Sequence, residues 1–246
     1  MLPLVLIPGI QGRWEYMRGT VDALSACFRV VTFSLRGNTM EDYAGQVSRA
    51  LDEHHLDRAV ICGVSFGGLV ALRFAAVFPE RTIALVMVST PAPGWHLRPR
   101  HQLYARLPWI FGPLFLAETP WRLRAEMSAA LPDRRARWAF NRAALRTFIS
   151  APVPLTAMAA RARLIERLDM RADCAGVSAP TLVVTGEPEL DHVVPAEGSS
   201  EYVRLISGAR SVILERTGHT GTMTRPDAFA AIVDDFVRNP PHDRVA

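Results

Sequence analysis

Short apolar runs alternate with segments of helical periodicity over most of the chain. Six runs are rich in Val, Leu and Ile and carry few charges, at residues 4–7, 29–34, 59–62, 83–88, 181–185 and 211–215. Near-continuous apolar runs are typical of strands buried on both faces, as in a parallel sheet with helical crossovers. The pattern therefore predicts an α/β fold with a mostly parallel, doubly wound sheet.

Helices are predicted between these strands by apolar residues at helical spacing. Residues 40–54 and 67–78 fit this pattern, and Pro79 ends the second helix. The last predicted helix, 226–237, carries Phe229, Val233 and Phe236 on one face. These helices supply the crossovers that a parallel sheet requires.

The alternation stops after residue 88 and resumes at Pro180. Between them, 92–172 contains no strand candidate but many prolines, most of the tryptophans and the helix-like stretches 134–149 and 155–168. We therefore expect a helical cap inserted between two strands. The expected division is a core of residues 1–91 and 173–238, a cap of residues 92–172 and a frayed tail of residues 239–246.

The composition of the chain limits the kinds of binding partner that we expect for it. The chain has 246 residues, of which 49% are hydrophobic, so it can bury one large core. The net charge of +4 raises the question of nucleic-acid binding. However, all 28 basic residues are arginine, 24 acidic residues are interspersed with them, and no nucleic-acid-binding motif occurs. We expect no nucleic-acid partner, and the sequence predicts no oligomeric state.

The spacing of the cysteines and the hydropathy of the chain indicate in which cellular compartment we expect the protein. Cys27, Cys62 and Cys174 are irregularly spaced, which argues against a disulfide framework and for a reducing, cytoplasmic location. The apolar start lacks a basic region and breaks at Pro8, unlike a signal peptide. No run of about 18 uncharged apolar residues occurs, so no membrane span is expected.

The strongest chemical signal is Gly63-Val64-Ser65-Phe66-Gly67. It matches G-x-S-x-G and lies directly after a predicted strand and before a predicted helix, which is the context that this motif needs. A tight strand-to-helix turn strains the serine backbone and leaves room only for glycine two residues away on either side. We therefore predict that Ser65 is a nucleophile at the carboxyl end of the sheet.

A serine hydroxyl needs a base within hydrogen-bonding distance and an acid that orients the base. Of the seven histidines, only His219 lies in a glycine-flanked loop between the last strand and the last helix. The loop after the strand 181–185 offers Glu187, Glu189 and Asp191 as acids, and the loop after the strand 83–88 offers none. The predicted chain order is serine, acid, histidine.

These residues resemble the α/β-hydrolase superfamily, specifically its capped esterase, lipase and C–C hydrolase branch. The resemblance covers essentially the whole chain, through residues 4–9, 34–38, 63–68, 180–195 and 218–219. It implies the α/β-hydrolase fold and a triad acid four residues before a proline, which is Asp191 relative to Pro195. Glu189 has the usual offset from Gly186, but we favour Asp191 because the proline abuts the next helix.

The resemblance also implies an oxyanion hole and a reaction. Its donors are the backbone N–H groups of Phe66 and, from the loop after the first strand, Ile10. Pro8-Gly9 stands where many relatives have His-Gly, which removes a side chain from that loop but no backbone donor. A serine at position 65 disfavours the members that attack through a carboxylate, and we expect no cofactor and no metal.

The cap is expected to roof Ser65 with apolar side chains and to exclude water. The candidate substrate-binding residues are Trp95, Trp109, Phe111, Phe115 and Trp121. An apolar roof over a polar centre favours small to medium apolar carboxylic esters, so we predict a serine esterase or lipase-like enzyme. The alternatives are a C–C bond hydrolase or lactonase with the same triad, or a catalytically slow ligand receptor on this fold.

Overall fold

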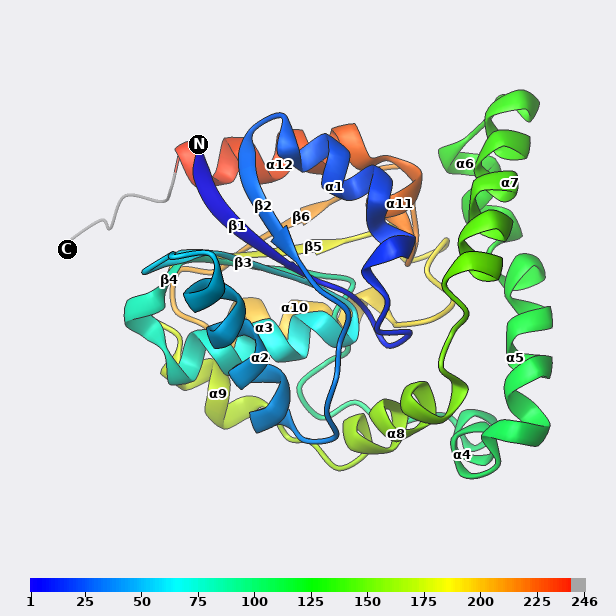
Figure 1. Cartoon of the computed structure of the whole chain (residues 1–246), viewed down its shortest axis with the longest axis horizontal. Coiled ribbons are helices and arrows are strands. Elements are labelled where there is room, and N and C mark those ends of the chain that lie inside the picture. Colours follow the sequence, from blue (N-terminus) through cyan, green and yellow to red (C-terminus); the bar gives the residue numbers. More distant parts are fainter. Residues whose placement is uncertain (240–246) are drawn as a thin grey trace.

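Six parallel strands form the central sheet (Figure 1). The computed structural model describes residues 1–239, apart from the side chains of residues 196 and 197. The strands are β1 (Leu2–Ile7), β2 (Phe28–Thr32), β3 (Ala59–Val64), β4 (Thr82–Val88), β5 (Thr181–Thr185) and β6 (Arg210–Ile213). Their order is β2-β1-β3-β4-β5-β6, and all neighbouring pairs are parallel. The predicted parallel sheet is confirmed, with slightly shifted strand ends.

Helices cover both faces of the sheet, which explains why its central strands β3 and β4 are buried along nearly their whole length. On β1, Val5 and Ile7 face one core while Leu4 and Leu6 face the other, since successive side chains point to opposite faces. Figure 1 shows one helical layer on each side. One layer contains α1 (Arg18–Ser25), α11 (Gly221–Thr224) and α12 (Pro226–Arg238); the other contains α2 (Met40–Glu53), α3 (Phe66–Val77), α9 (Arg171–Gly176) and α10 (Ala196–Leu205).

Local sequence signals set the ends of the core helices. Helix α2 begins with a capping box, in which the Thr39 hydroxyl accepts from the Asp42 N–H and the Asp42 carboxylate accepts from the Thr39 N–H. Helix α3 ends before Pro79, where a 3₁₀ turn (Pro79–Arg81) leads into β4. A second 3₁₀ turn, Trp14–Met17, precedes α1. The helices predicted at 40–54, 67–78 and 226–237 are confirmed as α2, α3 and α12.

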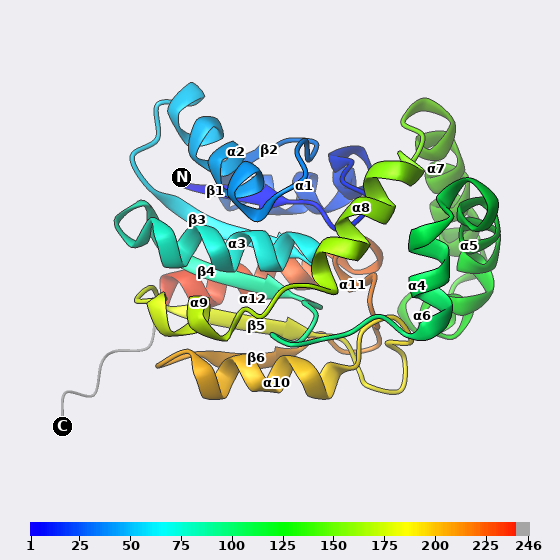
Figure 2. The same ribbon diagram turned by 90° about the horizontal axis from the view of Figure 1, so that it is seen from below.

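Five inserted helices between β4 and β5 form the predicted cap. They are α4 (Pro99–Arg106), α5 (Pro108–Arg122), α6 (Arg124–Ala130), α7 (Arg134–Ser150) and α8 (Leu155–Ile165). Figure 2 shows them gathered at one end of the sheet. The boundaries at residues 92 and 172 remain predictions, and the predicted tail lies outside the described residues from position 240 onward.

Within residues 1–239, no single helix is long and apolar enough to cross a bilayer. Helices α7 and α8 would suffice in length and composition only as a pair, and they are bent by 102° with respect to each other.

Candidate active site

Ser65 lies in the sharp turn between β3 and α3. Its backbone angles are φ 55° and ψ −119°, a left-handed region that a serine adopts only under strain. The Ser65 N–H donates to the carbonyl of Val88 at 2.7 Å, which ties the turn to the end of the neighbouring strand β4. The turn therefore presents the serine at the carboxyl ends of the parallel strands.

The glycines of the motif are required by close backbone approach. A Cβ at Gly63 would lie 2.0 Å from the carbonyl oxygen of Gly67, and a Cβ at Gly67 would lie 2.4 Å from the carbonyl oxygen of Ile7. Both distances are far inside van der Waals contact, and the neighbouring atoms belong to the backbone. Larger residues at either position would force the turn apart.

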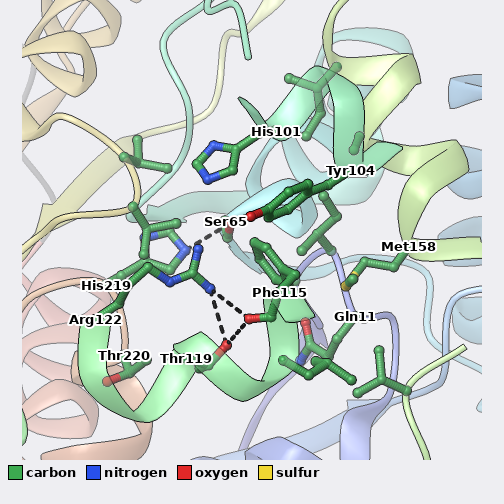
Figure 3. A pocket seen from close by; sticks show the side chains of 18 of the residues that line it. Gln11, Ser65, His101, Tyr104, Phe115, Thr119, Arg122, Met158, His219 and Thr220 are labelled. Atoms are coloured by element: carbon green, nitrogen blue, oxygen red, sulfur yellow. Dashed lines mark hydrogen bonds between the residues drawn. The ribbon is translucent and has the colours of Figure 1, made fainter. Parts of the chain in front are cut away.

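His219 and Asp191 lie next to Ser65. The His219 Nε2 lies 3.1 Å from the Ser65 Oγ, and the His219 Nδ1 lies 3.3 Å from the Asp191 Oδ2 (Figure 3 shows the first contact). The second oxygen of Asp191, Oδ1, accepts from the backbone N–H groups of Val193 and Val194, both at 2.9 Å. The structure thus brings the three predicted side chains into one chain of hydrogen bonds.

The environment of Asp191 favours its charged form. Burial of the carboxylate acts to raise its pKa, but the hydrogen bond and charge of His219 and the two backbone donors together outweigh burial. The pKa of Asp191 is therefore lowered, and the group is ionised at neutral pH. An ionised carboxylate beside Nδ1 favours the imidazole tautomer whose Nε2 can accept the serine proton.

The other two candidate acids do not reach His219. Glu189 is exposed, and the Glu187 carboxylate accepts a hydrogen bond from the backbone N–H of Arg216 at 2.7 Å. The structure therefore brings Asp191, not its alternatives, to the histidine. The loop that carries Asp191 and the loop that carries His219 pack closely against each other. A Cβ at Gly218 would lie only 2.3 Å from the carbonyl oxygen of Leu190.

A cavity of about 340 Å³ lies over Ser65, between the sheet edge and the cap. Gly9, Ile10, Ser65 and His219 line its floor, so the predicted second oxyanion donor borders the same space as the nucleophile. Most of the wall is apolar and comes from cap residues, among them Trp95, Tyr104, Phe115, Leu116, Leu155 and Met158. The volume suits a small substrate, since it lies at the lower end of the range for ligand sites.

The predicted aromatic roof is only partly found. Trp95 and Phe115 line the cavity, whereas Phe111 stacks on Tyr104 at 5.5 Å and lies behind the wall. Trp109 and Trp121 are 76% and 77% exposed and do not line the cavity, so the structure does not bring them to the site. Helical spacing directs Phe115 inward and puts Trp121, six residues later, on the opposite side of α5.

Two cap residues that sequence reasoning missed face this cavity. Arg122, at the end of α5, and His101, in α4, both line it. In the sequence, His101 is one of seven histidines and Arg122 is one of 28 arginines. The one available signal was the spacing of Phe115, Thr119 and Arg122, which puts them on one face of α5.

A buried carboxylate connects the cap to the histidine loop. Glu126, in α6, is 1% exposed, and its Oε1 accepts from the backbone N–H and the hydroxyl of Thr220, both at 2.8 Å. Burial raises the pKa of Glu126, while the Thr220 donors and the nearby His219 act in the opposite direction. No local sequence signal links an acid in the cap to a residue almost a hundred positions later.

A buried arginine holds the loop that carries Ile10. Arg161, in α8, is 2% exposed and donates to the carbonyls of Ile10 at 3.0 Å and Leu35 at 2.8 Å. Its Nε also donates to the Tyr43 hydroxyl at 3.2 Å. The cap therefore fixes the conformation of the loop that follows β1.

The described residues contain no cluster of three or more His, Cys, Asp or Glu side chains able to hold a metal ion. The cysteines Cys27, Cys62 and Cys174 are all free thiols.

Comparisons with known proteins agree with this architecture. The chain is 27% identical to a pimeloyl-[acyl-carrier protein] methyl ester esterase of Nitrosomonas europaea, over 91% of this chain and 89% of that protein. It is 23% identical to 3-oxoadipate enol-lactonase 1 of Acinetobacter baylyi, over 93% and 84%. The crystal structure of the enol-lactonase from Burkholderia xenovorans LB400 matches with a TM-score of 0.78 at 24% identity, over 97% and 92% of the two chains.

The fold and the family match lead to the same assignment. The enol-lactonase structure shares the fold of this chain. Residues 4–232 match the family described as "Alpha/beta hydrolase family", which is nearly the whole described chain. The chain therefore belongs to the alpha/beta hydrolase family.

Proposed function

We propose that this protein is a serine hydrolase that cleaves carboxylic esters of small to medium, largely apolar substrates. The observation that carries the proposal is the Ser65 Oγ at 3.1 Å from the His219 Nε2, at the floor of a largely apolar cavity. A hydroxyl within hydrogen-bonding distance of an oriented imidazole is the arrangement that activates a serine nucleophile.

In the proposed acylation step, His219 takes the Ser65 proton while Oγ attacks the ester carbonyl. The imidazolium that forms is stabilised by the ionised Asp191. The negative charge on the carbonyl oxygen is stabilised by the backbone N–H groups of Phe66 and Ile10. His219 then protonates the leaving alcohol, which leaves an acyl group on Ser65.

In the proposed deacylation step, water enters from the side vacated by the alcohol. His219 removes its proton as the water oxygen attacks the acyl carbonyl, and the proton returns to Ser65 when the acid is released. The apolar cap walls keep bulk water away from the acyl-enzyme, which strengthens the electrostatic contacts of the oxyanion. No step requires a cofactor.

A lactone is the second candidate substrate, and two relatives support it. The Acinetobacter baylyi relative and the Burkholderia xenovorans structure are both enol-lactonases. A lactone is a cyclic ester, so the same attack by Ser65 opens the ring, but the alcohol stays attached to the acyl group. The cavity of about 340 Å³ accommodates a compact ring as readily as a short linear ester.

Covalent labelling with a fluorophosphonate probe tests the proposal. The wild-type protein is expected to label at one serine, and Ser65→Ala is expected to abolish the label. Ser128→Ala, at an exposed cap serine, is the matched control and should label as the wild type does. Persistent labelling of Ser65→Ala, or absence of label on the wild type, contradicts the proposal.

A substrate panel then separates the candidate reactions. p-Nitrophenyl esters of increasing acyl length and a set of lactones would be compared by kcat/KM. Efficient turnover of short esters supports the first candidate, and a strong preference for lactones supports the second. Labelling without steady-state turnover of either class favours the C–C bond hydrolase or the slow ligand receptor over an ester hydrolase.

A further inference from the structure

One charged side chain faces the otherwise apolar cavity. Among the described residues that line the cavity, Arg122 is the sole arginine, and no aspartate or glutamate is present. In the view of Figure 3, its guanidinium is drawn next to the ring of His219, in the pocket that Ser65 also lines. An arginine that only packs against neighbouring residues usually extends its charged end into water. Arg122 lines the cavity instead.

Contacts within α5 hold the guanidinium in a fixed orientation. Its carbon lies 4.2 Å from the centre of the Phe115 ring, a cation–π contact. Its Nη2 donates to the Thr119 hydroxyl at 3.1 Å and to the Phe115 carbonyl at 3.4 Å. These contacts use one nitrogen and one face of the group, and they leave its remaining edge free to bind a ligand.

No carboxylate in the described part of the chain forms an ion pair with Arg122, although the charge of Glu118 acts on it from a distance. Glu118, one helical turn earlier in α5, forms its ion pair with Arg100 instead. The Arg122 Nε is buried and has no hydrogen-bond partner among the described residues. The part of the guanidinium that faces the cavity therefore has no acceptor within the described residues.

The second polar group on this wall does not supply the missing negative charge. His101 lies edge-on to the Phe115 ring at 6.1 Å. Burial, and then the charge of Arg122, lower the pKa of His101, so its imidazole is neutral at neutral pH. The roof of the cavity therefore carries one net positive charge, while its other walls are apolar.

We propose that Arg122 binds a carboxylate of the substrate, so that the preferred substrates are esters carrying a second, free carboxylate away from the scissile bond. This inference rests on the proposed ester hydrolase function and names its substrate class. The guanidinium supplies a charge-assisted hydrogen bond from its Nη1, which has no hydrogen-bond partner among the described residues, and the apolar walls contact the methylene groups between the two ends. Arg122 is a specificity-determining residue, and it takes no part in proton transfer.

A matched pair of substrates tests the charge directly. Methyl hydrogen adipate and methyl hexanoate have the same acyl chain length and the same leaving group, but only the first has a terminal carboxylate. The wild-type enzyme is expected to prefer methyl hydrogen adipate by about 10- to 100-fold in kcat/KM, since a hydrogen bond to a charged group contributes about 1.5–3 kcal/mol. Methanol release measures both reactions.

Three variants assign the preference to Arg122. Arg122→Met is expected to lose most of it, mainly through a higher KM for methyl hydrogen adipate, so that the ratio of the kcat/KM values for the two esters falls toward 1. Arg122→Lys should keep part of the preference, because an ammonium retains the charge but not the guanidinium geometry. Arg124→Met, at an exposed arginine two residues later, is the control and should behave as the wild type.

The outcomes separate this inference from the proposed function. If wild type and Arg122→Met label equally with fluorophosphonate and hydrolyse both esters with the same relative rates, the inference is wrong while the hydrolase function stands. If the wild type neither labels nor cleaves either ester, the proposed function itself fails. Thermal unfolding of Arg122→Met, together with its retained labelling, distinguishes loss of substrate binding from loss of folding.

Discussion

The carboxylate of Glu126 holds the residue that follows the proposed catalytic histidine. Its Oε1 accepts from both the N–H and the hydroxyl of Thr220, so a cap helix and the histidine loop share one buried hydrogen-bond unit. This contact is formed between α6 and the loop after β6, which lie far apart in the sequence. The cap therefore does more than cover the cavity, because it also orients the loop that carries His219.

Removing this carboxylate should weaken both folding and catalysis. Glu126→Ala leaves two buried donors of Thr220 without an acceptor, which costs about 2–4 kcal/mol of the free energy of unfolding. We also expect a lower kcat, since the His219 loop loses a constraint. Glu126→Gln keeps an acceptor oxygen and is expected to retain kcat within a few-fold. Urea unfolding and ester kinetics on both variants test this, and equal kcat values for Glu126→Ala and the wild type contradict it.

The same residue should make stability depend on pH. Burial raises the pKa of Glu126 above its usual value of 4.5, so the folded protein binds its proton more tightly than the unfolded chain does. The folded state is thus favoured below pH 4.5, and this contribution is lost as pH rises through the folded-state pKa. Relative to Glu126→Gln, the wild type should be less stable at about pH 8 than at about pH 5. A pH-independent difference in the free energies of unfolding refutes this.

The buried guanidinium of Arg161 should position the oxyanion loop. Arg161→Met leaves the carbonyls of Ile10 and Leu35 without their donor and is expected to cost about 3 kcal/mol or more of stability. It should also lower kcat about 10-fold, because the Ile10 N–H is displaced from the proposed oxyanion position. The control is Tyr43→Phe, which removes one partner of Arg161 but not the contact to Ile10. An unchanged kcat in folded Arg161→Met limits this arginine to a structural role.

The core of this protein was predictable because its signals are local. Each buried strand is a short apolar run, and the glycines of the Ser65 turn are required by contacts with backbone only four residues away or in the adjacent strand. The order of the strands also limits which loops share the carboxyl edge of the sheet. Position after the last strand therefore indicated His219, whereas position alone left three acids open, and the choice of Asp191 came from the family resemblance and its spacing from Pro195.

The cap was predictable as a set of helices but not as a binding surface. Which side of α5 faces the cavity depends on how the helix is rotated against the core, and aromatic residues occur on both sides. Phe115 therefore lines the cavity, while Trp121 is exposed. Arg122 and Glu126 were missed for the same reason. Their roles arise from contacts across the cavity and to Thr220, which no short-range pattern records.

The last prediction concerns the choice between Asp191 and Glu189 as the acid that contacts His219. Asp191 contacts His219 Nδ1, whereas Glu189 is exposed, so Asp191→Asn should reduce kcat by about 10³- to 10⁴-fold and Glu189→Gln should leave it unchanged. An asparagine keeps the size of the side chain, but its amide group no longer favours the tautomer in which Nε2 can accept the serine proton. Fluorophosphonate labelling rates at Ser65 should fall in parallel with kcat for Asp191→Asn, since the probe needs the same activated hydroxyl. The reverse result, in which Glu189→Gln is the impaired variant, would mean that the acid loop adopts another register when the enzyme turns over.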